Sequence, residues 1–172
     1  MTVQTLTGER ADLLESLGMA RYFLKYTVRD LTDEQAAARP TVSELTLGGL
    51  IKHVGEIERQ WARFVTDGPS AVAMPEDEAG FEAWANGFRM LPGETLASII
   101  ARYDEIASET DELIRTWPDL DASHELPPAP WFRPGARRSA RRVFTHIIAE
   151  TAQHAGHADI LRESIDGQKS MG

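Results

Sequence analysis

The sequence predicts an all-α fold, a four-helix bundle with a long crossover between the second and third long helices. Two observations lead to this prediction. Apolar residues recur at the three- and four-residue spacing of an amphipathic helix in four long segments, and no segment alternates like a β-strand over more than a few residues. The chain has 172 residues, of which 42% are hydrophobic, so we expect a single domain over residues 1–172 with a sizeable core.

The first long helix is predicted from about Gly8 to Val28. Its apolar positions recur with helical spacing and include Leu13, Leu17, Ala20 and Leu24. A short helix is expected at Asp33–Ala38, because Thr32 and Gln35 have the spacing of a capping box and Pro40 closes the segment.

The second long helix is predicted from about Thr46 to Thr66, ending at Asp67-Gly68-Pro69, a sequence typical of turns. Residues Ser70–Met90 are expected to form the crossover. Within it, a short amphipathic turn is predicted around three aromatic residues, Phe81, Trp84 and Phe88.

The third long helix is predicted to start near Pro92, because proline is favoured in the first turn, and to stop at Trp117-Pro118. The stretch Pro118–Gly135 contains five prolines and is expected to be a loop. The fourth long helix is predicted over about Ala136–Ile165. It should end at Asp166-Gly167, with the glycine as its C-terminal cap.

Composition and charge exclude several classes of function. The net charge of −9 disfavours binding to nucleic acid or to an anionic membrane surface. No stretch approaches the ~18 apolar residues of a membrane span, and the polar N-terminal region has no apolar signal core, so we expect a cytoplasmic protein. Without cysteine, the chain can supply neither a thiolate metal ligand nor a thiol nucleophile.

The run HIIAETAQHAGHADILRESIDG places three metal-ligand side chains on the last predicted helix: Glu150, His154 and His157. Glu150 and His154 are four residues apart and therefore share a face, which is a spacing that offers two donors to one metal. A third donor must come from elsewhere. His53 is the one histidine on another predicted helix, and it flanks the apolar stripe of that helix.

A helical projection separates the histidines of the last helix. His154 lies ~20° from the centre of the apolar stripe, whereas His146 and His157 lie ~80–100° from it. Glu150 falls between these groups, at the edge of the buried face. The simpler alternative is an ordinary surface pair of Glu150 and His154, with His157 paired to Asp159 or Glu163.

The segments LIKHVGEIERQW and HIIAETAQHAGHADILRESIDG together resemble the DinB/YfiT-like superfamily. They are most similar to the actinobacterial branch that ends in GHADILRE-x-IDG, which is related to mycothiol-dependent maleylpyruvate isomerases and mycothiol S-transferases. The resemblance extends over essentially the whole chain. It implies a four-helix bundle with a divalent metal, often zinc, at one end, held here by His53, Glu150 and His154.

One departure from the pattern concerns His157. Many members carry Arg-Gly-Gln after the last histidine ligand, whereas this chain has Ala155-Gly156-His157. His157 is then a group that supports a ligand, an alternative ligand or a proton carrier near the metal, and spacing does not decide among these.

Such a site indicates a class of chemistry. Three protein ligands leave zinc an open position, as in catalytic zinc sites, and zinc lowers the pKa of a bound thiol. Because the chain has no cysteine, the thiol must be a cosubstrate, and the resemblance implies mycothiol. We therefore expect a zinc-dependent thiol S-transferase, or a related isomerase, acting on an electrophilic small molecule. The alternative is a non-enzymatic, metal-stabilised binding or stress-response module that dimerises through an exposed helix face.

Four arginines lie within six residues near the start of the fourth helix: Arg137, Arg138, Arg141 and Arg142. Pairing with the acid-rich segments Glu76–Glu82 or Glu105–Glu112 is the simpler interpretation, and contact with an anionic substrate or a second copy is the functional one. Trp131-Phe132 either lines a pocket mouth or packs over the bundle end. Arg162-Glu163 and Asp166-Gly167 are interpreted as structure at the helix end.

Overall fold

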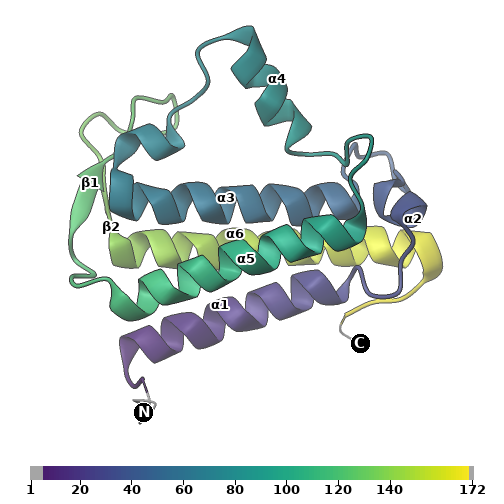
Figure 1. Cartoon of the computed structure of the whole chain (residues 1–172), viewed down its shortest axis with the longest axis horizontal. Helices are drawn as coiled ribbons and strands as arrows, with labels where there is room; N and C mark the ends of the chain where they lie inside the picture. The colour runs from purple at the N-terminus through teal and green to yellow at the C-terminus, as the bar shows by residue number, and fades with distance from the viewer. Residues whose placement is uncertain (1–5, 171–172) are drawn as a thin grey trace.

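The computed structural model describes residues 6–170, and its main feature is a bundle of four long helices that lie side by side (Figure 1). They are α1 (Glu9–Tyr26), α3 (Leu47–Asp67), α5 (Leu96–Thr116) and α6 (Ala140–Asp166). Helix α1 packs on α6, α6 on α3, α3 on α5, and α5 on α1, which closes the bundle. The predicted all-α four-helix bundle is therefore confirmed.

Helices α1 and α6 run in the same direction. Arg141 at the start of α6 forms an ion pair with Glu9 at the start of α1. At the other end, the buried Arg162 of α6 donates from Nη1 to the carbonyl oxygens of Thr27 and Arg29, just beyond α1. Arg162 therefore satisfies carbonyl groups that the end of α1 leaves free. Arg162 belongs to helix-end structure, as predicted.

Helices α3 and α5 run antiparallel to α1 and α6, and parallel to each other. Ion pairs from α1 to α5 show the opposite direction, because Arg21 pairs with Asp111 whereas the later Lys25 pairs with the earlier Asp104. Two parallel neighbouring helices cannot be joined by a short loop, so the chain must return along the length of the bundle. This requirement accounts for the crossover that the sequence predicts.

The crossover holds a longer helix than expected. After Gly68, which has a φ of 81°, the chain forms a short 3₁₀ helix, η1 (Pro69–Val72), and then α4 (Glu78–Asn86). In Figure 1, α4 stands away from the bundle on the side of α3. None of its residues is buried, and Phe81 and Trp84 are about half exposed. The amphipathic turn predicted around these aromatic residues is thus a helix of nine residues.

The start of α5 differs from the prediction near Pro92. The helix begins at Leu96, because Thr95 and Ser98 form a capping box. Before it, Gly93 has a φ of 89°, which interrupts any helix starting at Pro92. The Glu94 carboxylate accepts hydrogen bonds from the Leu91 backbone N–H and from Lys52 of α3. The cap and these side-chain bonds outweigh the helix-starting preference of proline.

The loop predicted over Pro118–Gly135 is largely irregular, but it contains one strand of a short hairpin, and the second strand replaces the first turn of the predicted fourth helix. Strand β1 (Ser123–Glu125) pairs antiparallel with β2 (Arg137–Ser139). Helix α6 consequently begins at Ala140, where the Ser139 side chain accepts a hydrogen bond from the Arg142 backbone N–H. Strands of three residues are too short to show an alternating pattern, so the sequence did not reveal them.

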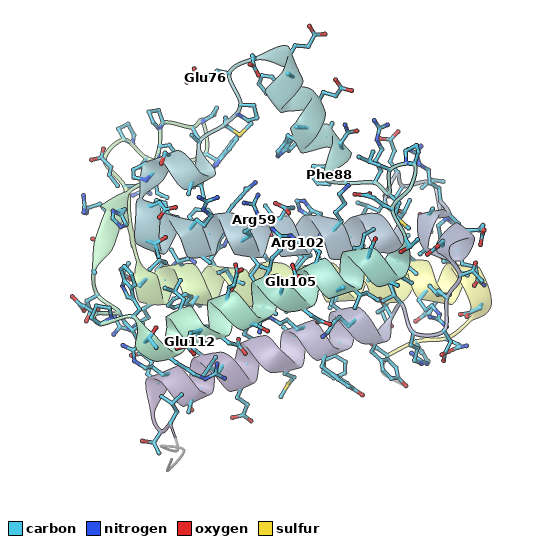
Figure 2. All side chains as sticks on the ribbon, viewed as in Figure 1. Arg59, Glu76, Phe88, Arg102, Glu105 and Glu112 are labelled. Carbon is cyan, nitrogen blue, oxygen red and sulfur yellow. The ribbon has the colours of Figure 1, made fainter. Side chains whose placement is uncertain are left out.

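Two smaller predictions about helix ends are confirmed. The short helix α2 (Asp33–Ala37) starts with the capping box of Thr32 and Gln35, and α6 ends at Gly167 with a φ of 76°. The apolar side chains form two core clusters, one around Leu50 and Leu161 and the other around Phe64 and Phe144. Figure 2 shows that polar side chains project from the outer faces. Within residues 6–170, no helix is long and apolar enough to cross a membrane.

Candidate metal and substrate site

His53 lies on the face of α3 that meets α6 and the crossover. The helix starts at Leu47 after the cap residue Thr46, whose side chain accepts from the Gly49 backbone N–H. Its apolar stripe turns Leu50 and Val54 into the core. His53, at the edge of that stripe, is half-buried. Its ring stacks on Phe88 with centroids 4.2 Å apart. The His53 imidazole is thus held between the bundle and the crossover.

The ring of His53 also meets His154 of α6. The two imidazoles are edge-to-face, with centroids 5.1 Å apart and planes at 88°. His53 and His154, which the family resemblance implied as ligands of one metal, therefore lie on the adjacent helices α3 and α6 and touch each other.

On α6, the carboxylate of Glu150 lies between two histidines of its own helix. One turn later, His154 places Nε2 3.7 Å from Oε2, and one turn earlier, His146 places Nε2 3.8 Å from Oε1. All three residues are partly buried, with side-chain exposures of 31% for Glu150, 17% for His154 and 18% for His146. A carboxylate at this depth favours a partner that carries positive charge.

His157 contacts His154, and among the described residues it forms no ion pair with Asp159 or Glu163. The two Nδ1 atoms are 3.3 Å apart, which is a hydrogen-bonding distance when one of them carries the proton. Since Nδ1 of His154 is engaged here, its Nε2 is the nitrogen left on the side of Glu150. Of the three roles open to His157, this contact fits a group that supports His154.

Burial holds three histidines of this cluster neutral: His53, His146 and His154. Burial lowers the pKa of His53 to about 4, and the His154 imidazole adds to the effect. Burial also lowers the pKa of His146 to about 4, with Arg138 and Arg142 contributing. For His154, burial lowers the pKa against the attraction of Glu150. Neutral imidazoles keep a lone pair free, which is the form that binds metal ions.

The donor chemistry fits a divalent metal, but the side chains are not gathered around one point. His154 is the common neighbour of His53 and Glu150, and all the donors are nitrogen or oxygen. Within residues 6–170, no group of three histidine, aspartate or glutamate side chains is arranged to hold a metal ion. Binding to His53, Glu150 and His154 together would therefore require side-chain rotation.

The comparison with protein families decides the family. A family model described as Mycothiol-S-transferase matches residues 12–167, which is most of the chain. The chain belongs to the mycothiol S-transferase family. The resemblance to DinB-like proteins, drawn from the second and fourth long helices, is thereby confirmed.

The structural comparison agrees with this family's fold. The protein is similar to the crystal structure of a conserved protein from Enterococcus faecalis, with a TM-score of 0.69 and 13% identity over 95% of this chain and all of that one. At this identity the likeness shows the fold alone. No curated protein matches the chain.

In this mycothiol S-transferase family member, three further residues join the cluster, namely His146, Arg138 and Phe88. His146 meets Trp61 edge-on, with ring centroids 4.8 Å apart, and Arg138 lies over the same indole at 4.4 Å. Phe88 covers His53 from the crossover. The spacing of four between His146 and Glu150 repeats that between Glu150 and His154, and it was the available signal for His146. The sequence singled out Arg138 only as one of four clustered arginines, and no local pattern indicates Phe88.

A cavity of about 580 Å³ reaches the cluster from the crossover side. It lies between α3 and the segment containing α4, and its lining includes His53, Ile57, Met74, Trp84 and Phe88. Two residues of this lining are labelled in Figure 2, where Phe88 lies just after α4 and Arg59 lies on α3. A small molecule entering here would meet the His53 imidazole directly.

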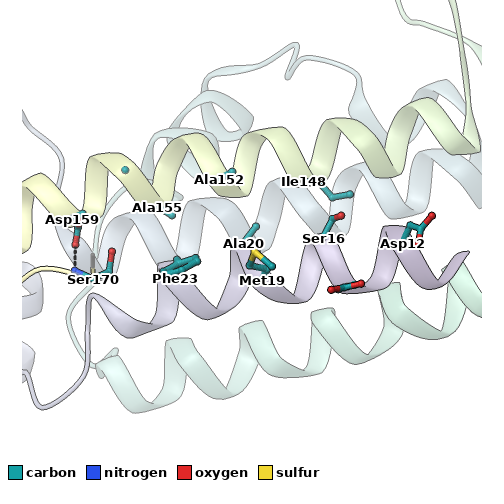
Figure 3. Close-up of a pocket in the computed structure, with 12 residues that line it drawn as sticks. Asp12, Ser16, Met19, Ala20, Phe23, Ile148, Ala152, Ala155, Asp159 and Ser170 are labelled. Atoms are coloured by element: carbon teal, nitrogen blue, oxygen red, sulfur yellow. Dashed lines mark hydrogen bonds between the residues drawn. The ribbon is translucent and has the colours of Figure 1, made fainter. Parts of the chain in front are cut away.

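A second cavity, of about 640 Å³, lies between α1 and α6 (Figure 3). Met19 and Phe23 face Ala152 and Ala155 across it, with acidic residues near its rim. None of the candidate ligands lines this cavity. It is therefore separate from the cluster of histidines.

The arginines near the start of α6 do not pair as expected. Arg141 forms ion pairs with Glu9 and Asp121, and Arg137 bonds to Ser123. Within the described residues, no ion pair joins these four arginines to Glu76–Glu82 or Glu105–Glu112. Arg137 and Arg138 lie in strand β2, and not in the fourth helix, where the sequence predicted them.

The two aromatic residues of the proline-rich loop have different surroundings. Trp131 is 64% exposed, whereas Phe132 packs against the core cluster around Phe64. Of the two predicted alternatives, packing over the bundle end therefore applies to Phe132.

Proposed function

We propose that this chain is a metal-dependent thiol S-transferase that joins mycothiol to an electrophilic small molecule. The observation that carries the proposal is the meeting of His53 with the Glu150–His154 pair across α3 and α6, next to an accessible cavity. Membership of the mycothiol S-transferase family supports mycothiol as the thiol. The chain has no cysteine, so the reacting sulfur must come from a cosubstrate.

His53, Glu150 and His154 would hold the metal, and zinc suits two imidazoles and a carboxylate. When bound, a divalent metal lowers the pKa of a thiol and keeps it as the nucleophilic thiolate. The surrounding chain prepares the ligands. Burial keeps His53 and His154 unprotonated near neutral pH, so metal binding displaces no proton from them.

Neighbouring residues orient the ligands. His157 engages Nδ1 of His154 and so fixes the ring with Nε2 towards Glu150. Phe88 stacks on His53 and lines the same cavity, so it holds the imidazole in place at the cavity wall. The cavity between α3 and the crossover gives the electrophile its path to the cluster.

The proposal is tested by the consumption of mycothiol with monochlorobimane, a neutral electrophile. We expect transfer that requires added zinc, stops with a chelator and is lost in His154→Ala. His124→Ala is a matched control, because His124 bonds to the Val65 carbonyl and lies outside the cluster. Zinc-loaded protein without transfer, or full activity in His154→Ala, would overturn the proposal.

The non-enzymatic alternative is favoured by one observation, the closeness of His157 to His154. If His157 became a fourth ligand, the site would be closed, as structural zinc sites are. Zinc would then raise the unfolding midpoint strongly while mycothiol remained unconsumed. Measuring both quantities on one sample separates the two functions.

A further inference from the structure

Arg138 lies in an aromatic frame beside the candidate site. It occupies the middle of β2, directly opposite His124 of β1. Its guanidinium lies over Trp61 at 4.4 Å and 5.4 Å from the centre of the Phe132 ring. Contacts of this kind hold a guanidinium plane in a fixed orientation while leaving its N–H groups free to bind.

The guanidinium of Arg138 lacks an acidic partner. Its Nη1 is buried without a hydrogen-bond partner among residues 6–170, and no carboxylate of these residues forms an ion pair with it. The neighbouring Arg141, by contrast, has two acidic partners. Burial lowers the pKa of Arg138, and the positive charge of Arg142 adds to this effect. Arg138 as a whole is half-buried, but its buried Nη1 group has no partner, which is unfavourable. An anion that bound this guanidinium would offset that cost.

A row of contacts connects Arg138 to Glu150, one of the proposed metal ligands. Trp61 contacts both Arg138 and His146, and His146 lies 3.8 Å from Glu150. The Glu150 carboxylate also attracts Arg138 through space. Arg138 is therefore at one end of a row that continues through His146 and Glu150 to His154.

We propose that Arg138 binds a carboxylate group of the electrophilic substrate, so that this enzyme prefers acidic electrophiles. This inference rests on the proposed S-transferase function and adds a substrate class to it. A guanidinium presents two parallel N–H donors that match the oxygens of one carboxylate. Bound in this way, the substrate would lie along α6 with its electrophilic carbon towards Glu150 and His154.

The matched electrophiles iodoacetate and iodoacetamide differ in the charge of one group. With either of them, the mycothiol sulfur forms a bond to the methylene carbon, the carbon–iodine bond breaks, and iodide leaves with the electron pair. The thiol proton passes to solvent. We expect the catalysed rate, corrected for the uncatalysed one, to favour iodoacetate over iodoacetamide more than the solution reaction does.

Arg138→Met should lower kcat/KM for iodoacetate by roughly 10- to 100-fold, the effect of losing charge-assisted hydrogen bonds, and leave iodoacetamide within about twofold. Arg138→Lys keeps the positive charge but lacks the two parallel N–H donors. It should therefore retain only part of the preference for iodoacetate over iodoacetamide. Arg102→Met is the matched control, because it removes an exposed positive charge on α5, away from this cluster, and should change neither substrate. Equal losses for both electrophiles in Arg138→Met would overturn the inference.

Direct binding separates this inference from the transferase proposal. Propionate cannot react, and its binding is followed through the NMR signal of the Arg138 Nε–H group. We expect a saturable shift with propionate and none with propionamide, even in protein that transfers no thiol to monochlorobimane. No shift with propionate would mean that Arg138 pairs internally and would overturn the inference. Inactivity with monochlorobimane alone would overturn only the transferase proposal.

Discussion

The imidazole of His154 lies edge-to-face against that of His53, with ring centroids 5.1 Å apart, although the two residues belong to different helices. This contact is possible because α3 and α6 are adjacent and antiparallel. It places a residue from early in the chain beside the Glu150–His154 pair, and the proposed site depends on it.

The role of His157 can be measured through metal affinity. We expect His157→Ala to weaken zinc binding by about 10- to 100-fold without abolishing it, because the variant loses the Nδ1 contact that orients His154. Competition with a zinc-binding dye gives the affinity. Unchanged affinity would contradict the supporting role, and complete loss of zinc would instead make His157 a ligand.

The stability of the metal-free protein should depend on pH in a defined window. His53 and His146 have a pKa near 6.5 when unfolded and about 4 when folded, so the unfolded state binds more protons between these values. Their contribution to the free energy of unfolding is complete above pH 6.5 and is lost as the pH falls towards 4. We expect roughly 1 to 2 kcal/mol for each imidazole, allowing for solvent screening.

Urea unfolding at several pH values in the presence of a chelator measures this dependence. His146→Gln removes one of the two imidazoles and should make the curve shallower over the same window. An identical curve for His146→Gln would show that His146 is not held neutral by its surroundings.

A buried ion cluster in the bundle should carry substantial stability. Arg21 of α1 binds both carboxylate oxygens of the fully buried Glu58 of α3 and also pairs with Asp111 of α5. Glu58→Gln removes the charge that compensates Arg21, so we expect about 3 kcal/mol of destabilisation in denaturant unfolding. In the more exposed pair of Lys25 and Asp104, Lys25→Met should cost less than about 1 kcal/mol. Similar losses in both variants would contradict this reasoning.

Arg162 should matter for folding and not for the site. It is 1% exposed, donates 2.8 Å and 2.7 Å hydrogen bonds to the carbonyls of Thr27 and Arg29, and pairs with Asp166. Arg162→Met should therefore lower the free energy of unfolding by about 3 kcal/mol. Arg63→Met, in an exposed pair with Asp67, is the control. A normal zinc affinity in folded Arg162→Met is expected, and its loss would assign Arg162 to the site as well.

Periodicity predicted the long helices because each buries one apolar face in the bundle. The same pattern placed His154 near that face and His53 at the edge of its stripe, but only the family resemblance implied that the two histidines share a site. Gly167 and the Thr32–Gln35 box were predictable because helix ends have local chemical requirements.

The contacts that the sequence did not predict join distant segments of the chain. Arg138 reaches Trp61 because a hairpin of three-residue strands sets its position, and strands so short leave no periodic signal. Arg21 and Glu58 are charged residues on largely apolar faces, and only the assembled bundle shows that they neutralise each other. Phe88 follows a helix that packs loosely, so its stacking on His53 has no local signature.

The metal content of the wild-type protein and of His53→Ala, determined together by mass spectrometry after zinc loading, tests the proposed site most directly. We predict one zinc per chain in the wild type and substantially less in His53→Ala, with both proteins equally folded by circular dichroism. His124→Ala should keep the wild-type content. A wild-type protein that binds no zinc, or a His53→Ala variant that retains one zinc per chain, would contradict a site shared between α3 and α6.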